Sequence, residues 1–230
     1  MRLVMFDVDG TLLTGNGIDD LCFAEALRSG LGIQHIDTEW SHYVNVTDSG
    51  VTSEIVGKKL LRKPEDSDIR TVRREYSTRL RQEIIKNPLS FRTVPGAVEL
   101  ISTLCSMENV RVCIATGGWR DPALMKLKAA GIPIGNIILT SSDDALQRES
   151  IMRLAYERTR IQANCEKFDS VLYVGDRRWD FANAQKLGWY FLGIARGKHA
   201  PELRQTGASH LQPDFMDQDY FLRVLETGEK

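Results

Sequence analysis

The chain has 230 residues, of which 42% are hydrophobic and 27% are charged, as is typical of an ordinary globular protein. Its formal net charge of −1 gives no general electrostatic reason to expect a nucleic acid or an acidic membrane as a partner. The four cysteines are scattered without a Cys-x-x-Cys pair, which argues against a disulfide framework or a zinc site and favours a reducing compartment. Because the first apolar run begins at the N-terminus and no stretch approaches the length of a membrane span, we expect a cytoplasmic protein without a signal peptide.

The first predicted element is a buried strand over Leu3–Phe6, which ends abruptly in the sequence DVDGT. Residues two apart in a strand point to the same side, so Asp7 and Asp9 would face one place if the extended backbone persists. Two like charges at short range repel each other, and a cation or a proton on one carboxyl group would relieve that repulsion. Gly10 allows the backbone to turn sharply and to approach another group closely.

The segment after this strand is predicted to be helical from residue 19 to residue 86. A first helix would stop at Gly30, and a longer helix keeps a period near 3.6 residues from Ile69 to Ile84. The flanking sequences, TGNG at 14–17 and NPLS at 87–90, have the glycine and proline content of hinges.

The length of this segment sets the predicted domain organisation. From Asp7 to Thr116 the chain runs 109 positions (116 − 7), whereas a strand–helix–strand unit needs only about 30 residues. We therefore predict a helical domain over residues 15–90, inserted into a core formed by residues 1–14 and 91–230.

Four later apolar runs complete the predicted sheet. They are nearly continuous rather than alternating, as expected for parallel strands that are buried on both faces. Helical patterns separate them, and this alternation predicts an α/β fold with a doubly wound, Rossmann-like parallel sheet. The predicted strands are Val110–Ala115, Ile137–Leu139, Val171–Val174 and Tyr190–Ile194, and the predicted helices start after Gly96, at Asp121-Pro122, at Glu149 and at Asp180.

Polar residues follow the predicted strands at the edge where such sheets bind their ligands, beyond the carboxyl ends of the strands. The sequence TGG starts at Thr116, and GDRRWD places Asp176 and Asp180 after a later strand. Arg148 lies at a helix start between these two sequences. Carboxylate oxygens suit Mg²⁺, while a hydroxyl, free main-chain N–H groups and a guanidinium suit phosphate oxygens. The pattern indicates a phosphoryl-transfer site.

Taken in this order, FDVDGTLL, ATGG and VGDRRWD resemble the haloacid dehalogenase superfamily of phosphohydrolases, and the helical insert resembles the cap domain of that superfamily. The resemblance covers the whole chain and implies a Mg²⁺-dependent phosphatase. It implies that Asp7 is the nucleophile, forming an aspartyl-phosphate, and that Asp9 protonates the leaving oxygen and then activates water. Mg²⁺ would bind Asp7, the main-chain carbonyl of Asp9 and Asp176, with Asp180 close by.

The resemblance also implies which groups hold the phosphate: Thr116, Gly117 and a basic residue of the family's third motif. That residue is usually a lysine, and this sequence departs from the pattern. Arg148 is the best-placed cation, since arginine stays charged and binds phosphate in a fork. Lys126, in the helix after Thr116, is the alternative.

The implied substrate is a small phosphorylated metabolite, a phosphoglycolate-like phosphomonoester, with no nucleic acid and no membrane as partner. The segment NVTDSG, with Thr47 and Asp48, resembles a motif of phosphoglycolate-phosphatase-like members and would face the substrate. A phosphomutase acting on a sugar phosphate would use the same aspartates, and a catalytically silent binding module could share the fold. Dehalogenase and phosphonatase chemistry in this superfamily lacks the second aspartate of the first motif, so Asp9 argues against both.

Overall fold

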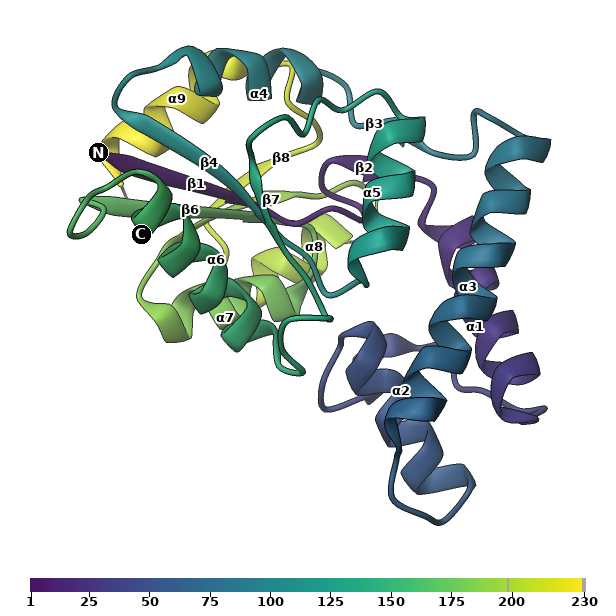
Figure 1. Cartoon of the computed structure of the whole chain (residues 1–230). Coiled ribbons are helices and arrows are strands. Elements are labelled where there is room, and N and C mark those ends of the chain that lie inside the picture. The colour runs from purple at the N-terminus through teal and green to yellow at the C-terminus, as the bar shows by residue number, and fades with distance from the viewer. Residues whose placement is uncertain (198, 229–230) are drawn as a thin grey trace.

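The computed structural model describes residues 1–197 and 199–228, and within them six parallel strands form one sheet in the order β5-β4-β1-β6-β7-β8 (Figure 1). The first strand of the chain is therefore central, between β4 and β6. Five of the strands confirm the predicted ones, and β8 was not predicted. The strands are β1 (Arg2–Phe6), β4 (Val110–Ala115), β5 (Ile138–Thr140), β6 (Ser170–Gly175), β7 (Tyr190–Ile194) and β8 (His210–Gln212).

Helices cover both faces of this sheet, which confirms the predicted α/β architecture (Figure 1). Alternate residues of β1 enter two separate cores: Val4 and Phe6 pack with α4 and α9, whereas Leu3 and Met5 pack with α6 and α7. Burying each such side chain contributes about 1.5–3 kcal/mol, and this explains the nearly continuous apolar strands. The covering helices are α4 (Ala97–Ser106), α5 (Arg120–Ala129), α6 (Arg148–Gln162), α7 (Arg178–Leu187), α8 (His199–Gln205) and α9 (Gln218–Thr227).

Residues 16–86, here called the helical unit, form a third apolar cluster beside the carboxyl ends of the strands (Figure 1). Leu27, Val72 and Leu80 are fully buried in this cluster. Trp119 joins it from the sheet-bearing part of the chain, so the two parts share a buried contact. The unit comprises α1 (Asn16–Leu31), the 3₁₀ turn η1 (Trp40–His42), α2 (Asp48–Lys59) and α3 (Asp66–Lys86).

The helical unit differs from the sequence prediction in two respects. It is not helical throughout, because irregular chain at 32–39, 43–47 and 60–65 separates its helices. The first helix runs past Gly30 and stops at Gly32, whose left-handed conformation (φ 69°) provides the usual C-terminal cap. Gly30 instead allows a close approach to Val72, whose Cα would lie 3.4 Å from an added Cβ.

Three helices of the core begin earlier than predicted. α5 starts at Arg120, so Pro122 occupies its third position rather than its first. α6 starts at Arg148 and α7 at Arg178, one and two residues before the predicted starts. The first turns of α6 and α7 reach the cavity described below, through Arg148 and Trp179.

The two connections to the helical unit run side by side. β2 (Leu13–Thr14) pairs with β3 (Arg92–Thr93) in an antiparallel ribbon, and only Gly15 separates β2 from α1. Gly15 has φ 114°, and a Cβ there would lie 2.4 Å from the carbonyl oxygen of Ser90. Glycine is therefore required at this junction.

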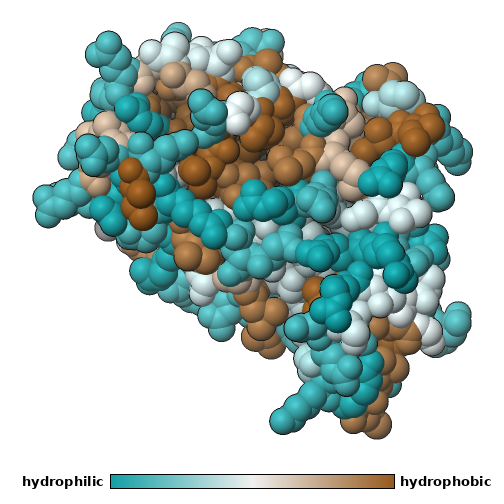
Figure 2. Space-filling model, viewed as in Figure 1, coloured by the Kyte–Doolittle hydropathy of each residue, from teal (hydrophilic) through white to brown (hydrophobic). Residues whose placement is uncertain are grey.

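Figure 2 shows apolar side chains gathered between α4 and α5, where Ile101, Val112 and Ile134 line a groove. In the described part of the chain, none of the helices has both the length and the apolar character that a bilayer crossing requires.

Candidate active site

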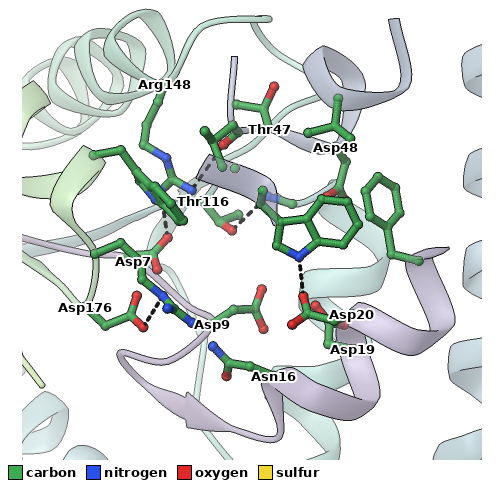
Figure 3. A pocket seen from close by; sticks show the side chains of 18 of the residues that line it. Asp7, Asp9, Asn16, Asp19, Asp20, Thr47, Asp48, Thr116, Arg148 and Asp176 are labelled. Carbon is green, nitrogen blue, oxygen red and sulfur yellow. Dashed lines mark hydrogen bonds and ion pairs between the residues drawn. The ribbon is translucent and has the colours of Figure 1, made fainter. Parts of the chain in front are cut away.

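Three neighbouring strands deliver polar side chains to one point at the sheet edge. Phe6 of β1 lies level with Ile114 of β4 and Val174 of β6, so the residues that follow these strands converge. Asp7, Thr116 and Asp176 accordingly line one cavity of about 410 Å³, which the helical unit covers (Figure 3). The sequence-predicted residues Asp9, Thr47, Asp48, Gly117 and Arg148 line the same cavity, whereas Asp180 lies behind its wall.

Asp7 and Arg148 form a buried ion pair at the centre of the site. The guanidinium donates from Nη1 to Asp7 Oδ1 at 3.0 Å and to Asp180 Oδ1 at 3.1 Å. Burial raises the pKa of Asp7 to about 6, with a further contribution from the charge of Asp180, while Arg148 opposes the rise. Arg148 thus separates two carboxylates that would otherwise repel each other and orients Asp7 toward the cavity.

The same carboxylates meet the requirements of a divalent cation. Asp7, Asp176 and Asp180 each place one oxygen within 4.8 Å of the others. Asp176 Oδ1 is buried and has no hydrogen-bond donor, and burial raises the pKa of Asp176 well above its ordinary value. A buried oxygen that accepts no hydrogen bond, among crowded carboxyl groups, lowers the stability of the fold. A hard cation such as Mg²⁺ would supply the positive charge that these oxygens lack. The residues present therefore fit Mg²⁺.

Asp180 supports this cluster rather than offering a free ligand. Its Oδ1 accepts hydrogen bonds from Arg148 and from the Tyr173 hydroxyl, the latter at 3.3 Å. Its Oδ2 accepts the main-chain N–H of Arg177 at 3.1 Å and so caps the start of α7. Both oxygens are occupied, and the side chain is fully buried.

Two glycines allow the close packing of these groups. Gly10 adopts φ 86°, and a Cβ there would lie 2.0 Å from Asp176 Oδ2, so Asp176 is the group that the turn approaches. A Cβ on Gly117 would lie 2.5 Å from Nη2 of Arg148. Any side chain at either position would displace a charged group of the site.

Thr116 is positioned to donate a hydrogen bond into the cavity. Its hydroxyl oxygen accepts the N–H of Gly118 at 3.1 Å, which leaves the hydroxyl hydrogen for another acceptor. The residue is 1% exposed, and its own N–H donates to Thr140 of the neighbouring strand at 3.0 Å. The hydroxyl is therefore fixed by the sheet.

Asp9 pairs with Lys126 rather than with the carboxylate cluster. The ammonium lies 2.7 Å from both Asp9 oxygens and 2.9 Å from Asp19 Oδ1 of α1. Burial raises the pKa of Asp9 to about 7, while Lys126 opposes the rise. Burial also lowers the pKa of Lys126, but Asp19 and Asp9 outweigh it and hold the lysine charged. Both candidate cations thus belong to the site, Arg148 on Asp7 and Lys126 on Asp9.

The start of α2 rests on the TGG sequence of the core. The N–H of Asp48 donates to Gly117 O, and its Oδ2 accepts the main-chain N–H of Trp119, both at 2.8 Å. Burial raises the pKa of Asp48 to about 8. Thr47 caps α2 by accepting the N–H of Gly50, and its hydroxyl donates to Leu146 O at 2.8 Å. The expected loop is therefore a helix N-terminus, and the Thr47 hydroxyl is committed to the fold.

Sequence reasoning missed several residues that line the cavity. Asn16, Asp19 and Asp20 of α1 lie in it, and so do Trp40 and His199. The spacing of the first three, i, i+3 and i+4, places them on one face of a helix that follows a hinge. This polar helix face was the feature of the sequence from which these residues could have been predicted.

Comparisons with known proteins give a family match and several structures of similar fold. The chain matches the family described as haloacid dehalogenase-like hydrolase over residues 1–188. Among curated protein sequences, none matches this chain. A solved structure of a hydrolase from Pseudomonas syringae shares 24% identity with a TM-score of 0.74, covering 97% of this chain and 98% of that one.

Two further solved structures carry more specific names. CbbY from Rhodobacter sphaeroides, in complex with phosphate, shares 19% identity with a TM-score of 0.68 and covers 94% of this chain and 95% of that one. A predicted phosphoglycolate phosphatase from Haemophilus somnus shares 14% identity with a TM-score of 0.63, covering 97% of both chains. At such identities these likenesses establish the fold alone.

Proposed function

Because the chain belongs to the haloacid dehalogenase-like hydrolases, we propose that it is a Mg²⁺-dependent cytoplasmic phosphatase that hydrolyses phosphate monoesters of small metabolites. One observation carries the proposal: the buried pair of Asp7 and Arg148 faces a cavity beside Thr116. An anionic nucleophile next to phosphate-binding donors is an arrangement for phosphoryl transfer. The phosphate complex of CbbY, which has the same fold, is consistent with this assignment.

In the first step, a carboxylate oxygen of Asp7 attacks phosphorus while the bond from phosphorus to the alcohol oxygen breaks. Asp9 gives its proton to the departing oxygen. Thr116 and Arg148 donate to the phosphoryl oxygens and hold the group in line with Asp7. The products are a free alcohol and a phosphoryl group on Asp7, with Asp9 ionised and close to Lys126.

In the second step, water attacks phosphorus and gives a proton to the Asp9 carboxylate. The bond between phosphorus and the Asp7 oxygen breaks, so inorganic phosphate leaves and both aspartates return to their initial states. Asp7 and Asp176 would hold Mg²⁺, together with the carbonyl oxygen of Asp9. When bound, the cation neutralises charge that would keep a phosphate dianion away from an anionic nucleophile.

The experiment that tests this function is the turnover of an aryl phosphate and of an alkyl phosphate by the purified protein, followed by inorganic phosphate release. Steady release of phosphate from both supports a phosphatase. An isomerised sugar phosphate without phosphate release would show a phosphomutase, and no turnover of any phosphate ester would show a binding module. Either of the last two results overturns the proposal.

We expect Asp9→Asn to lower kcat/KM for an alkyl phosphate by about 10²–10⁴-fold, and for an aryl phosphate much less. The physical reason is that an alkoxide leaves poorly without a proton, whereas a phenolate is a better leaving group. The measurement is the ratio of the two kcat/KM values in wild type and variant. The aryl phosphate activity also serves as the control for folding, and equal losses on both substrates would show that Asp9 is not the general acid.

We also propose that residues 15–90, which comprise the helical unit and its two connections, close over the site as a cap domain. Its contacts with the core combine apolar packing around Trp119 with hydrogen bonds and ion pairs, among them Lys126 to Asp19. Ser49 accepts the indole N–H of Trp119 at 2.8 Å and donates to Ser142 O at 3.1 Å. The ribbon of β2 and β3 would keep the two connections together while Gly15 absorbs the rotation.

We expect Ser49→Ala to lower kcat/KM by about fivefold, because each lost hydrogen bond contributes about 0.5–1.5 kcal/mol to closure. The hydroxyl contacts the core outside the cavity, so the loss should be the same factor for every substrate. Ser53→Ala is the matched control, since Ser53 donates only to Ser49 O within α2. A changed ranking of substrates with Ser49→Ala would contradict a role in closure.

A further inference from the structure

The cavity has two chemically different ends (Figure 3). The end near Asp7 and Asp176 holds the donors for phosphate. The opposite end, toward which the alcohol part of a substrate would extend, is formed by the helical unit. We call it the leaving-group wall, and its residues are Asp19, Asp20, Phe23, Trp40 and Asp48.

The leaving-group wall carries negative charge that the described cavity does not balance. The helical unit contributes Asp19, Asp20 and Asp48 to this wall and no lysine or arginine. Lys126 reaches the wall from α5, but its ammonium is already bonded to Asp9 at 2.7 Å and to Asp19 at 2.9 Å. A carboxylate or second phosphate at this end would therefore meet the like charges of Asp19 and Asp20 in a partly desolvated space, whereas Asp48, whose pKa burial raises to about 8, is mostly uncharged at neutral pH.

The remaining cation of the described lining belongs to the core side. Arg177 donates from Nε to Asp176 Oδ2 at 2.9 Å, and its Nη1 lies 2.9 Å from Nε2 of His199. The Asp176 carboxylate thus pairs with this guanidinium, and the charge of Arg177 also opposes the rise in the pKa of Asp20.

The wall suits hydroxyl groups on a carbon chain. Asp20 accepts the indole N–H of Trp40 at 2.6 Å, and burial raises the pKa of Asp20 and of Asp48. Carboxylate oxygens accept hydrogen bonds from hydroxyl groups. The rings of Phe23 and Trp40, with centroids 5.5 Å apart, offer an apolar surface for C–H groups.

Resting on the proposed phosphatase function, we propose that the leaving-group wall selects phosphate monoesters of uncharged, polyhydroxylated alcohols and rejects esters whose alcohol part carries an anion. The cavity of about 410 Å³ lies within the range of small-molecule sites, about 300–1,000 Å³, and accommodates a short polyol. This proposal replaces the phosphoglycolate-like substrate that the sequence suggested, because glycolate presents a carboxylate to this wall.

The test uses substrate pairs that differ only in charge at the far end. Glycerol 3-phosphate and 3-phosphoglycerate differ by CH₂OH against a carboxylate, and ribitol 5-phosphate and 5-phosphoribonate repeat the comparison at five carbons. Phosphoethanolamine is measured as an ester whose alcohol part carries a positive charge. An aryl phosphate is measured as a generic substrate. We expect kcat/KM for each polyol ester to exceed that for its carboxylate partner by on the order of 100-fold.

Asp20→Asn tests whether the wall causes this ratio. It removes one charge, while its amide oxygen can still accept the Trp40 N–H, so we expect the ratio to narrow by about tenfold. Glu25→Gln is the matched control, because Glu25 lies on the same helix but is exposed and bonded to Arg28 outside the cavity. We expect the control to leave the ratio unchanged.

The outcomes separate the two proposals. No turnover of any ester, including the aryl phosphate, overturns the phosphatase function itself. Turnover of the aryl phosphate with equal or better use of the carboxylate esters overturns the charge selection alone. A preference for phosphoethanolamine over glycerol 3-phosphate, or an unchanged ratio in Asp20→Asn, overturns the assignment of this wall to uncharged alcohols.

Discussion

Asp7→Asn is expected to reduce turnover of every phosphate ester by at least about four orders of magnitude, as loss of a nucleophile does in other covalent enzymes. The amide keeps the shape of the carboxylate but lacks the lone-pair charge that attacks phosphorus. Its oxygen can still accept the hydrogen bond from Arg148, so the fold should survive. The measurements are kcat/KM with an aryl phosphate and the thermal unfolding midpoint.

The control for this variant is Asp219→Asn, a change of the same kind at an exposed position in the first turn of α9. It should retain full activity. A second measurement detects the phosphoryl group on the protein after turnover is stopped with acid. The wild-type protein should carry phosphate on Asp7, and the Asp7→Asn variant should carry none. Substantial activity in folded Asp7→Asn, or labelling at another residue, would show that the nucleophile lies elsewhere.

Removal of divalent cations is expected to abolish activity, and Mg²⁺ should restore it. Without a cation, the carboxylates of Asp7, Asp176 and Asp180 repel the phosphate dianion that must approach them. Binding can also be seen without turnover, because a ligand of the folded state at 100 times its Kd stabilises that state by about 2.7 kcal/mol. Mg²⁺ should therefore raise the unfolding temperature of the wild type.

Asp176→Asn connects this effect to the site. We expect the variant to lose both activity and the Mg²⁺-dependent rise in unfolding temperature, because Asp176 offers a buried oxygen that has no donor. Asp169→Asn is the matched control, since Asp169 is exposed and pairs with the N-terminal amine. Full turnover in metal-free buffer would contradict the proposed chemistry, whatever the behaviour of the variants.

The two cations of the site have separate functions in this scheme. Arg148 contacts Asp7, where the phosphoryl group is held, and Lys126 contacts Asp9, where protons move. Lys126 is 1% exposed and also binds Asp19, so the helical unit takes part in fixing Asp9, the proposed general acid. A buried charge that loses its partner is strongly destabilising. The pair of Lys126 with Asp19 therefore links the position of the helical unit to the position of Asp9.

The sequence by itself determined the central strands and the principal acidic residues. Leu3–Phe6 and Val171–Val174 were recognisable because each run is apolar along its own length and an aspartate follows within two residues. Parallel strands align their carboxyl ends, so the convergence of Asp7 and Asp176 followed once the sheet was predicted. Local patterns were sufficient here because a strand that is buried on both faces has apolar residues at consecutive positions.

Only the tertiary structure decided which charges pair and what forms the far end of the cavity. Arg148 and Asp7 lie 141 positions apart, and Lys126 and Asp9 lie 117 apart. β8 (His210–Gln212) has no apolar run of its own and depends on pairing with the edge of β7. Such contacts result from the packing of whole segments. The spacing of apolar residues along the sequence shows which side of a helix or strand is buried, but not which distant residue packs against it. The proposed selection between substrates rests on the same kind of contact, because the packing of the helical unit on the core brings Asp19, Asp20 and Asp48 to the cavity.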